Sequence, residues 1–166
     1  MLAKDFVLYN LIILMSCNVL GFVISLLPIY FKRLLKYRIQ NKKIDSKVFY
    51  GRLPLILFNI FLVAFISSIG LYFIFPIFDA DLEFSFLIIV LQLGTILFVD
   101  DLFFYILHRW MHENKFLLRK VHSIHHRAFS PLALEYLYVH PFEWMMGYIG
   151  PFIGIGIISL FSPVSC

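Results

Sequence analysis

The sequence predicts an all-α integral membrane protein, a helical bundle with three or four membrane-embedded helices. Two observations carry this prediction. First, 61% of the 166 residues are hydrophobic, including 20 Phe, and only 14% are charged, whereas soluble domains are roughly half apolar. A soluble domain this short would leave about a third of the surface of its unfolded chain in contact with water. So much apolar surface must therefore be covered by lipid. Second, the apolar residues form long runs close to the roughly 20 residues that a bilayer requires.

Three apolar runs and a fourth, less regular one predict the membrane helices. They are residues 6–30, 53–78, 84–107 and 144–164. The first run is too long for the apolar part of a cleaved signal peptide, and another span follows it, so we expect a retained anchor. Asp100 and Asp101 interrupt the third run. The fourth is rich in Gly and contains Pro151, which leaves open whether it spans the membrane, re-enters it or lies at its surface.

The connections between these runs differ in charge. Residues 31–52 hold eight Lys and Arg against one acid, whereas residues 79–83 read "DADLE". Short loops rich in Lys and Arg stay in the cytosol, so we expect the third run to return the chain to the cytosolic side. The basic loop could also bind anionic lipid headgroups, but we interpret it as a topology signal. It accounts for most of the net charge of +4, which therefore does not indicate nucleic-acid binding.

The six histidines all fall between residues 108 and 140. In "HRWMH", His108 and His112 are four residues apart, which places both rings on one face of a helix, a spacing that can bind one metal ion. In "HSIHH", the histidines again follow a helical spacing. They are His122, His125 and His126. Two such clusters predict a metal site. The alternative is an interfacial segment whose histidines contact headgroups beside the neighbouring Lys and Arg.

Ligand type leaves zinc, copper, iron and nickel open, because neutral imidazole suits all four. The first pair is not an HExxH motif, since "RWM" separates its histidines, and this disfavours a metalloprotease with a Glu base. The two cysteines, Cys17 and Cys166, lie far from the clusters. We therefore expect no disulfide framework and no zinc-finger, iron–sulfur or thiolate-haem site.

Taken together, "HRWMH", "HSIHH" and "SPLALEYLYVHPFEW" resemble the fatty acid hydroxylase and sterol desaturase superfamily of membrane di-iron oxygenases. Within it, the last segment is most similar to C-4 methylsterol oxidases. The resemblance covers residues 100–152 and implies a multi-pass enzyme of the endoplasmic reticulum membrane with a cytosolic site. It divides the chain into an anchor region, residues 1–99, and a His-box catalytic region, residues 100–166.

The resemblance implies that O2 and electrons from a donor such as cytochrome b5 oxidise a C–H bond of a lipid, in lipid or sterol biosynthesis. A sterol C-4 methyl group is the first expected substrate and a fatty acyl chain the second. The implied cofactor is two iron ions bound by histidines. The implied ligands are His108, His112, His122, His125, His126 and His140.

Four other residues are candidates for supporting roles. Asp101 and Tyr105 lie upstream on the face of His108 and His112. We expect them either to hydrogen-bond and orient the ligand rings or to have a capping or interfacial role at the membrane edge. Glu135 and Glu143 flank His140. Each is either a partner of a liganding imidazole or a solvated acid.

The family has a third His-x-x-His-His box downstream, and this sequence ends at Cys166 before any such box. We therefore interpret the chain as C-terminally truncated and expect the complete enzyme to be a monooxygenase. One alternative is a catalytically incomplete paralogue or fragment that binds lipid or pairs with a membrane partner. Another is a zinc-dependent membrane hydrolase with Glu135 or Glu143 as its base.

Overall fold

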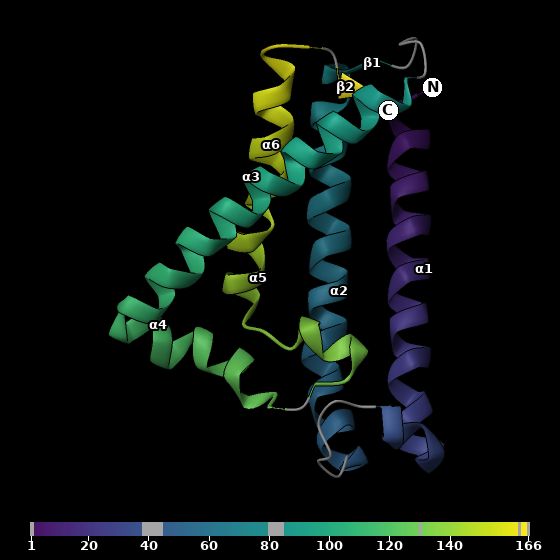
Figure 1. Cartoon of the computed structure of the whole chain (residues 1–166), viewed down its shortest axis with the longest axis vertical. Coiled ribbons are helices and arrows are strands. Elements are labelled where there is room, and N and C mark those ends of the chain that lie inside the picture. The colour runs from purple at the N-terminus through teal and green to yellow at the C-terminus, as the bar shows by residue number, and fades with distance from the viewer. Residues whose placement is uncertain (1, 38–44, 80–84, 130, 163, 166) are drawn as a thin grey trace.

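The computed structural model describes residues 2–37, 45–79, 85–129, 131–162 and 164–165. Helices make up nearly all of this part (Figure 1). They are α1 (Ala3–Tyr30), η1 (Lys32–Tyr37), α2 (Ser46–Ile74), η2 (Phe75–Ile77), α3 (Phe86–Glu113), α4 (Lys115–Lys120), η3 (His122–Arg127), η4 (Ala133–Leu137), α5 (Pro141–Gly147) and α6 (Ile149–Ser159). The predicted all-α membrane bundle is confirmed. Two short strands, β1 (Phe78–Asp79) and β2 (Val164–Ser165), pair in parallel.

Four helical segments of the described chain are long and apolar enough to cross a bilayer. They are Ala3–Tyr30, Ser46–Ile77, Phe86–Glu113 and Pro141–Ser159. The fourth, which the sequence left open, consists of α5 and α6 and runs back toward the end of the molecule where β1 and β2 pair (Figure 1). Many large apolar side chains of these helices are exposed, as expected of surfaces that face lipid.

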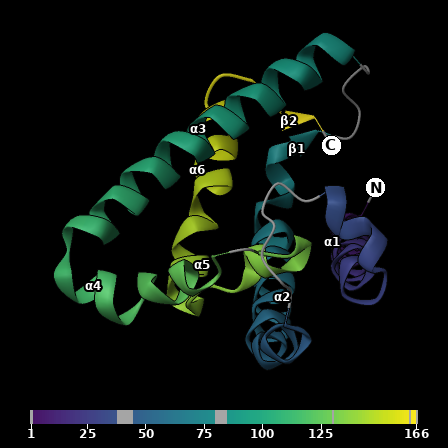
Figure 2. The same ribbon diagram turned by 60° about the horizontal axis from the view of Figure 1, so that its bottom comes forward.

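The helices place the histidine-rich segment toward the end of the molecule that holds η1 and the start of α2. α1 and α2 form an antiparallel pair, and α3 leans across the bundle toward the end where α1 stops and α2 starts (Figures 1 and 2). The N-terminus, β1 and β2 lie at the opposite end (Figure 1). The sequence-based expectation that the third span returns the chain to the side of the basic loop therefore agrees with the fold.

Small residues allow α6 to pack closely on α3. A Cβ atom added to Gly154 would lie 2.9 Å from the Cα atom of Ile96, and one added to Gly150 would overlap the carboxylate of Asp100. Glycines are common where membrane helices approach each other this closely. The contact fixes the tilt of α3 and so the position of its histidine-bearing end.

Asn114 turns the chain back after α3. It follows Glu113 directly, and its side-chain oxygen accepts hydrogen bonds from the backbone nitrogens of Phe116 and Leu117 at 3.0 and 3.1 Å, which caps α4. A buried apolar cluster then holds the two helices together. It consists of Leu107, Met111, Leu117 and Val121. The second histidine cluster is thereby brought under the end of α3.

Residues 131–140, here called the strap, pack against α1 and α2. Leu134 and Leu137 are buried with Ile56 of α2. The backbone nitrogen of Leu134 donates to Ser25 Oγ of α1 at 2.8 Å. Asn59 Nδ2 of α2 donates to the carbonyls of Leu137 and Val139 at 2.8 and 3.0 Å. The strap thus satisfies its backbone groups with polar side chains of membrane helices, as burial requires.

Candidate metal centre

The first histidine pair lies on α3, which continues to Glu113, beyond the predicted end of the apolar run at residue 107. His108 and His112 point to the same side of this helix, as their spacing predicts. Their Nε2 atoms are 3.2 Å apart.

The second cluster lies on a 3₁₀ helix, η3, and not on an α-helix. In a 3₁₀ helix, residues i and i+3 are eclipsed, and the rings of His122 and His125 accordingly stack with centroids 5.7 Å apart. His126 is turned toward His112, with ring centroids 5.1 Å apart. The tighter helix directs His126 toward the first pair.

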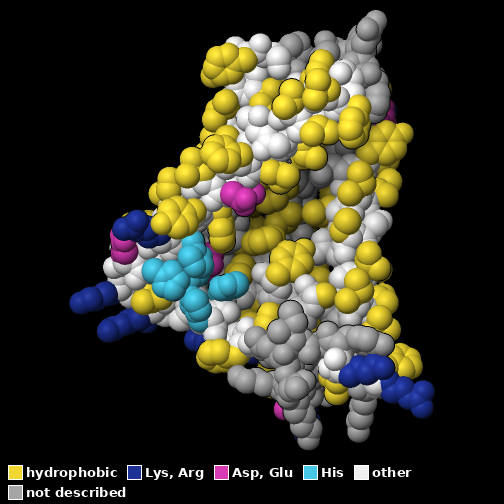
Figure 3. All heavy atoms as spheres, in the orientation of Figure 1, with side chains coloured by type: hydrophobic (Ala, Val, Ile, Leu, Met, Phe, Trp, Pro, Cys, Tyr) yellow, Lys and Arg dark blue, Asp and Glu magenta, His cyan; other side chains and the backbone are white. Residues whose placement is uncertain are grey.

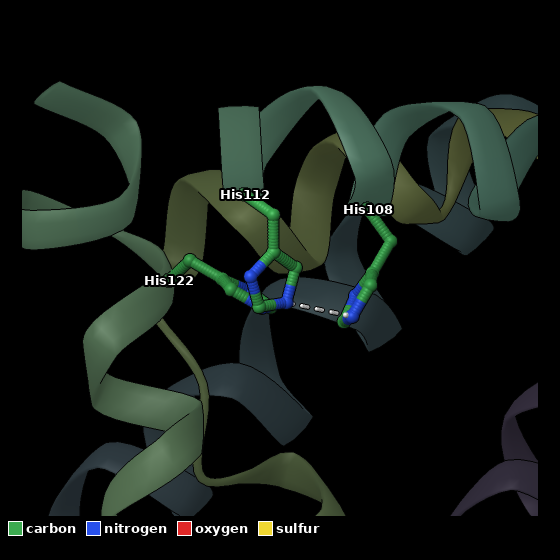
Figure 4. A group of neighbouring side chains, drawn as sticks. All are labelled: His108, His112 and His122. Atoms are coloured by element: carbon green, nitrogen blue, oxygen red, sulfur yellow. Dashed lines mark hydrogen bonds between the residues drawn. The ribbon is translucent and has the colours of Figure 1, made fainter. Parts of the chain in front are cut away.

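Three histidines from the two clusters converge on one point (Figure 4). The Nε2 atom of His112 lies 3.2 Å from that of His108 and 3.1 Å from that of His122. A ligand atom from each of the three residues lies within 4.8 Å of the others. The first pair and the second cluster therefore form one site.

Glu143 of α5 fixes the orientation of the His122 ring. Its Oε1 atom accepts a hydrogen bond from His122 Nδ1 at 2.9 Å, and both side chains are buried. With its proton on Nδ1, His122 presents the lone pair of Nε2 to the cluster. If Nε2 of His112 carries a proton, it can donate a hydrogen bond to Nε2 of His108 or to Nε2 of His122, but not to both. A metal cation can accept a lone pair from all three Nε2 atoms.

Other buried polar atoms here have no hydrogen-bond partner among the described residues. They are His108 Nδ1, His125 Nδ1 and Glu143 Oε2. Buried polar groups are nearly always paired with protein, water or an ion. Unpaired imidazole nitrogens around converging ring nitrogens therefore fit a metal-binding donor set.

Two histidines of the second cluster, His122 and His125, are held in the neutral form that metal binding needs. Burial, together with the neighbouring imidazoles, lowers the pKa of His122 to about 4. Burial and His126 also lower the pKa of His125. Because only neutral imidazole ligates a metal, these side chains need lose no proton to bind one at neutral pH.

The cluster opens to the surface beside a hollow. Figure 3 shows the histidine side chains gathered on one face, next to Lys and Arg side chains and a recess with hydrophobic walls. A cavity of about 520 Å³ adjoins the second cluster. Its walls are formed by His125, His126, Ala128, Phe129, Pro131, Leu132, Ala133, Glu135 and Tyr136. An apolar molecule can reach the histidines from this side.

Three predicted site residues lie outside this convergence. His140 caps α5, and its Nδ1 accepts from the backbone nitrogen of Phe142 at 3.1 Å. The ring contacts that join the other five histidines do not include His140. Asp101 and Tyr105 are exposed on α3, and no contact with a histidine is seen among the described residues. Their orienting role stays a prediction.

The two glutamates that the sequence could not rank have different partners. Glu143 binds His122, whereas Glu135 forms a buried ion pair with Arg52 of α2. Arg52 belongs to the basic loop that we interpret as a topology signal, and no sequence feature separates it from the other Lys and Arg residues of that loop. Asn59 does carry a signal, since an amide inside an apolar run is unusual.

Comparisons with known proteins match the part of the chain that contains the histidines. Residues 93–165 match the family model described as fatty acid hydroxylase. Over 68 residues, 41% of its length, the chain is 44% identical to sphinganine C4-monooxygenase 1 of Arabidopsis thaliana and covers 26% of that protein. Over 146 residues, 83% of its length, it is 30% identical to methylsterol monooxygenase 1 of Rattus norvegicus and covers 47% of it.

A third relative is named for a different activity. The chain is 46% identical over 55 residues, 33% of its length, to the very-long-chain aldehyde decarbonylase GL1-9 of Oryza sativa subsp. indica and covers 21% of that protein. The chain thus spans about half or less of each of these three relatives. No solved structure matches it at a significant level.

Proposed function

We propose that the chain carries the metal-binding part of a membrane enzyme that oxidises a lipid C–H bond, because residues 93–165 match the fatty acid hydroxylase family model. The observation that carries this proposal is the convergence of His108, His112 and His122. The apolar membrane helices and the cavity beside His125 and His126 support a lipid substrate.

We propose iron as the metal, held as two ions by the two histidine clusters. The ligands would be His108, His112, His122, His125 and His126, with His140 as a further candidate. The donor set suits iron, although imidazole alone also suits zinc and copper. When bound, iron would supply the activation of dioxygen.

The protein groups have separate tasks in this proposal. Glu143 holds the proton on Nδ1 of His122 and so keeps Nε2 free to bind. Burial keeps His122 and His125 neutral. The buried apolar residues between α3 and α4 exclude water from one side of the site. The cavity walls position the substrate against the other side.

We propose a sterol C-4 methyl group as the first candidate substrate, because the similarity to methylsterol monooxygenase extends over 83% of the chain. A sphingoid base or fatty acyl chain is the second, supported by the 44% identity to sphinganine C4-monooxygenase. Electrons would come from a carrier such as cytochrome b5. The site would face the cytosol at the endoplasmic reticulum membrane.

The first test is the metal content of the 166-residue chain in lipid nanodiscs, beside the double variant His122→Ala, His126→Ala. Lys115→Ala is a matched control, because Lys115 is an exposed residue between the two clusters. We expect iron in the wild type and the control, close to two ions per chain, and its loss in the double variant. Zinc in place of iron, or no metal in the wild type, contradicts the proposal.

The second test is oxidation of the substrate. The chain is supplied with O2, reduced cytochrome b5 and either a C-4 methylsterol or sphinganine, and products are identified by mass spectrometry. An oxidised sterol methyl group supports the first substrate and a C-4 hydroxyl on sphinganine supports the second.

A further inference from the structure

Arg52, at the start of α2, reaches into the histidine-rich segment. Its guanidinium donates to the carboxylate of Glu135 and, through Nη2, to the backbone carbonyl of Arg127 at 2.8 Å. It also lies over the ring of Tyr138, 4.9 Å from the centroid. The Arg52 side chain is 17% exposed and that of Glu135 only 3%. This degree of burial distinguishes the pair from a surface ion pair.

The Arg127 carbonyl belongs to the last residue of η3. The carbonyls at the end of a helix have no partner within the helix and need one from elsewhere. The first residue of η3, His122, is held by Glu143 of α5. Both ends of this short helix are therefore fixed, one from α5 and the other from α2.

His125 and His126 lie between these two attachment points. Both line the cavity of about 520 Å³ together with Glu135, the carboxylate that Arg52 binds. The hydrogen bond from Arg52 to the Arg127 carbonyl connects this end of η3 to a membrane helix, α2. Glu135 in turn accepts from the backbone nitrogen of Leu132 at 2.7 Å, so the same contact fixes the start of the strap.

We propose that Arg52 is a positioning residue of the metal centre, which holds His125 and His126 in place through the Arg127 carbonyl and Glu135. This inference rests on the proposed function, in which both histidines bind metal. A planar guanidinium can donate to two acceptors at fixed angles, whereas a lysine ammonium acts as a point charge. Arg52→Lys should therefore keep the positive charge but lose the paired hydrogen bonds to Glu135 and to the Arg127 carbonyl.

A purely electrostatic role is the competing explanation, because Arg52 also neutralises a buried carboxylate. The double variant Arg52→Met, Glu135→Gln separates the two explanations. It removes both charges, so that no unpaired buried charge remains, and also removes the bond to Arg127. If neutralisation were the whole role, this variant would bind metal like the wild type.

The experiment uses the full chain in nanodiscs, loaded with Co²⁺ as a spectroscopic probe and with Fe²⁺. Retention is measured against increasing chelator, and the visible spectrum of the cobalt form is recorded at saturation. Arg109→Met is the control, since Arg109 also forms an ion pair beside a histidine cluster, with Glu113, but both side chains are more than 60% exposed. Thermal melting of the metal-free variants tests folding.

We expect metal retention to fall about tenfold or more in Arg52→Lys and in the double variant, the range seen when partners of metal ligands are removed. We also expect a changed cobalt spectrum in both variants and none in Arg109→Met. Wild-type retention and spectrum in the double variant overturn the positioning role while leaving the proposed function intact. A wild-type chain that binds neither metal overturns both.

Discussion

His122 and Glu143 form a buried pair in which Nδ1 of the imidazole lies 2.9 Å from Oε1 of the carboxylate. The two residues come from different elements, η3 and α5, so this contact aligns the second histidine cluster with the fourth membrane segment. It also determines which ring nitrogen of His122 faces the first pair.

Replacing Glu143 should weaken metal binding. In Glu143→Leu, the Nδ1 atom of His122 loses its acceptor, and the ring can rotate or change tautomer. We expect metal affinity to fall about 10- to 100-fold and the metal-free chain to lose about 1–3 kcal/mol for the unpaired buried group. Metal titration and thermal melting measure the two effects. Glu143→Gln, whose amide oxygen can still accept, should be milder, and equal losses in both variants would contradict this explanation.

The metal-free chain should lose stability in mild acid. The pKa of His122 is about 4 in the folded chain, below its ordinary value of about 6.5. Between these values the unfolded chain binds more protons at His122, so the contribution of this residue to stability rises with pH in this window and falls as the pH drops from about 6.5 toward 4. Thermal melting at several pH values measures the slope. The slope should flatten in His122→Gln, and an unchanged slope would assign the effect to other groups.

Enlarging Gly154 should separate α3 from α6. A Cβ atom there would lie 2.9 Å from a backbone atom, Cα of Ile96, so the helices must move apart. We expect Gly154→Val to destabilise the chain by about 1–3 kcal/mol, the usual cost of overpacking. Gly156→Val is the matched control, because a Cβ atom at Gly156 would have no neighbour within 4 Å. Similar melting temperatures for both variants would contradict the close packing.

The two ends of the bundle should be accessible from opposite sides of the membrane. Phe116 lies near the histidines and Phe161 near the other end, and their side chains are 68% and 84% exposed. Single cysteines at these positions, with Cys17→Ala and Cys166→Ser, can be labelled by an impermeant thiol reagent in sealed microsomes. We expect label from the cytosolic side at position 116 alone. Label at both positions would contradict four crossings.

Much of the fold follows from hydropathy and charge, because each is a local property of the sequence. The apolar runs predicted three membrane helices, with ends that differ by at most seven residues from those in the structure, and located the fourth segment without assigning it. The charge of the loops predicted which ends lie together. The fourth segment could not be assigned from sequence, because its Gly and Pro content weakens the helix signal. Its helical path depends on the close contacts of Gly150 and Gly154 with α3, which are tertiary.

The site was predictable where its residues are close in sequence. The spacing of His108 and His112 is enough to place both rings on one face. The sequence could not show that Glu143, and not Glu135, binds a histidine, because the positions of the two carboxylates depend on how the strap and α5 fold back. The contribution of Arg52 was hidden for the same reason, since 83 residues separate it from Glu135.

The strap depends on partners that precede it in the chain. Ser25, Arg52 and Asn59, which bind its backbone and Glu135, belong to α1 and α2. Chains are synthesised and fold from the N-terminus, so both helices can enter the bilayer before the strap leaves the ribosome. Unpaired backbone groups are costly in lipid, and here the side chains that pair with them precede the strap in the sequence. The partners of the strap's backbone groups are therefore synthesised before the strap itself.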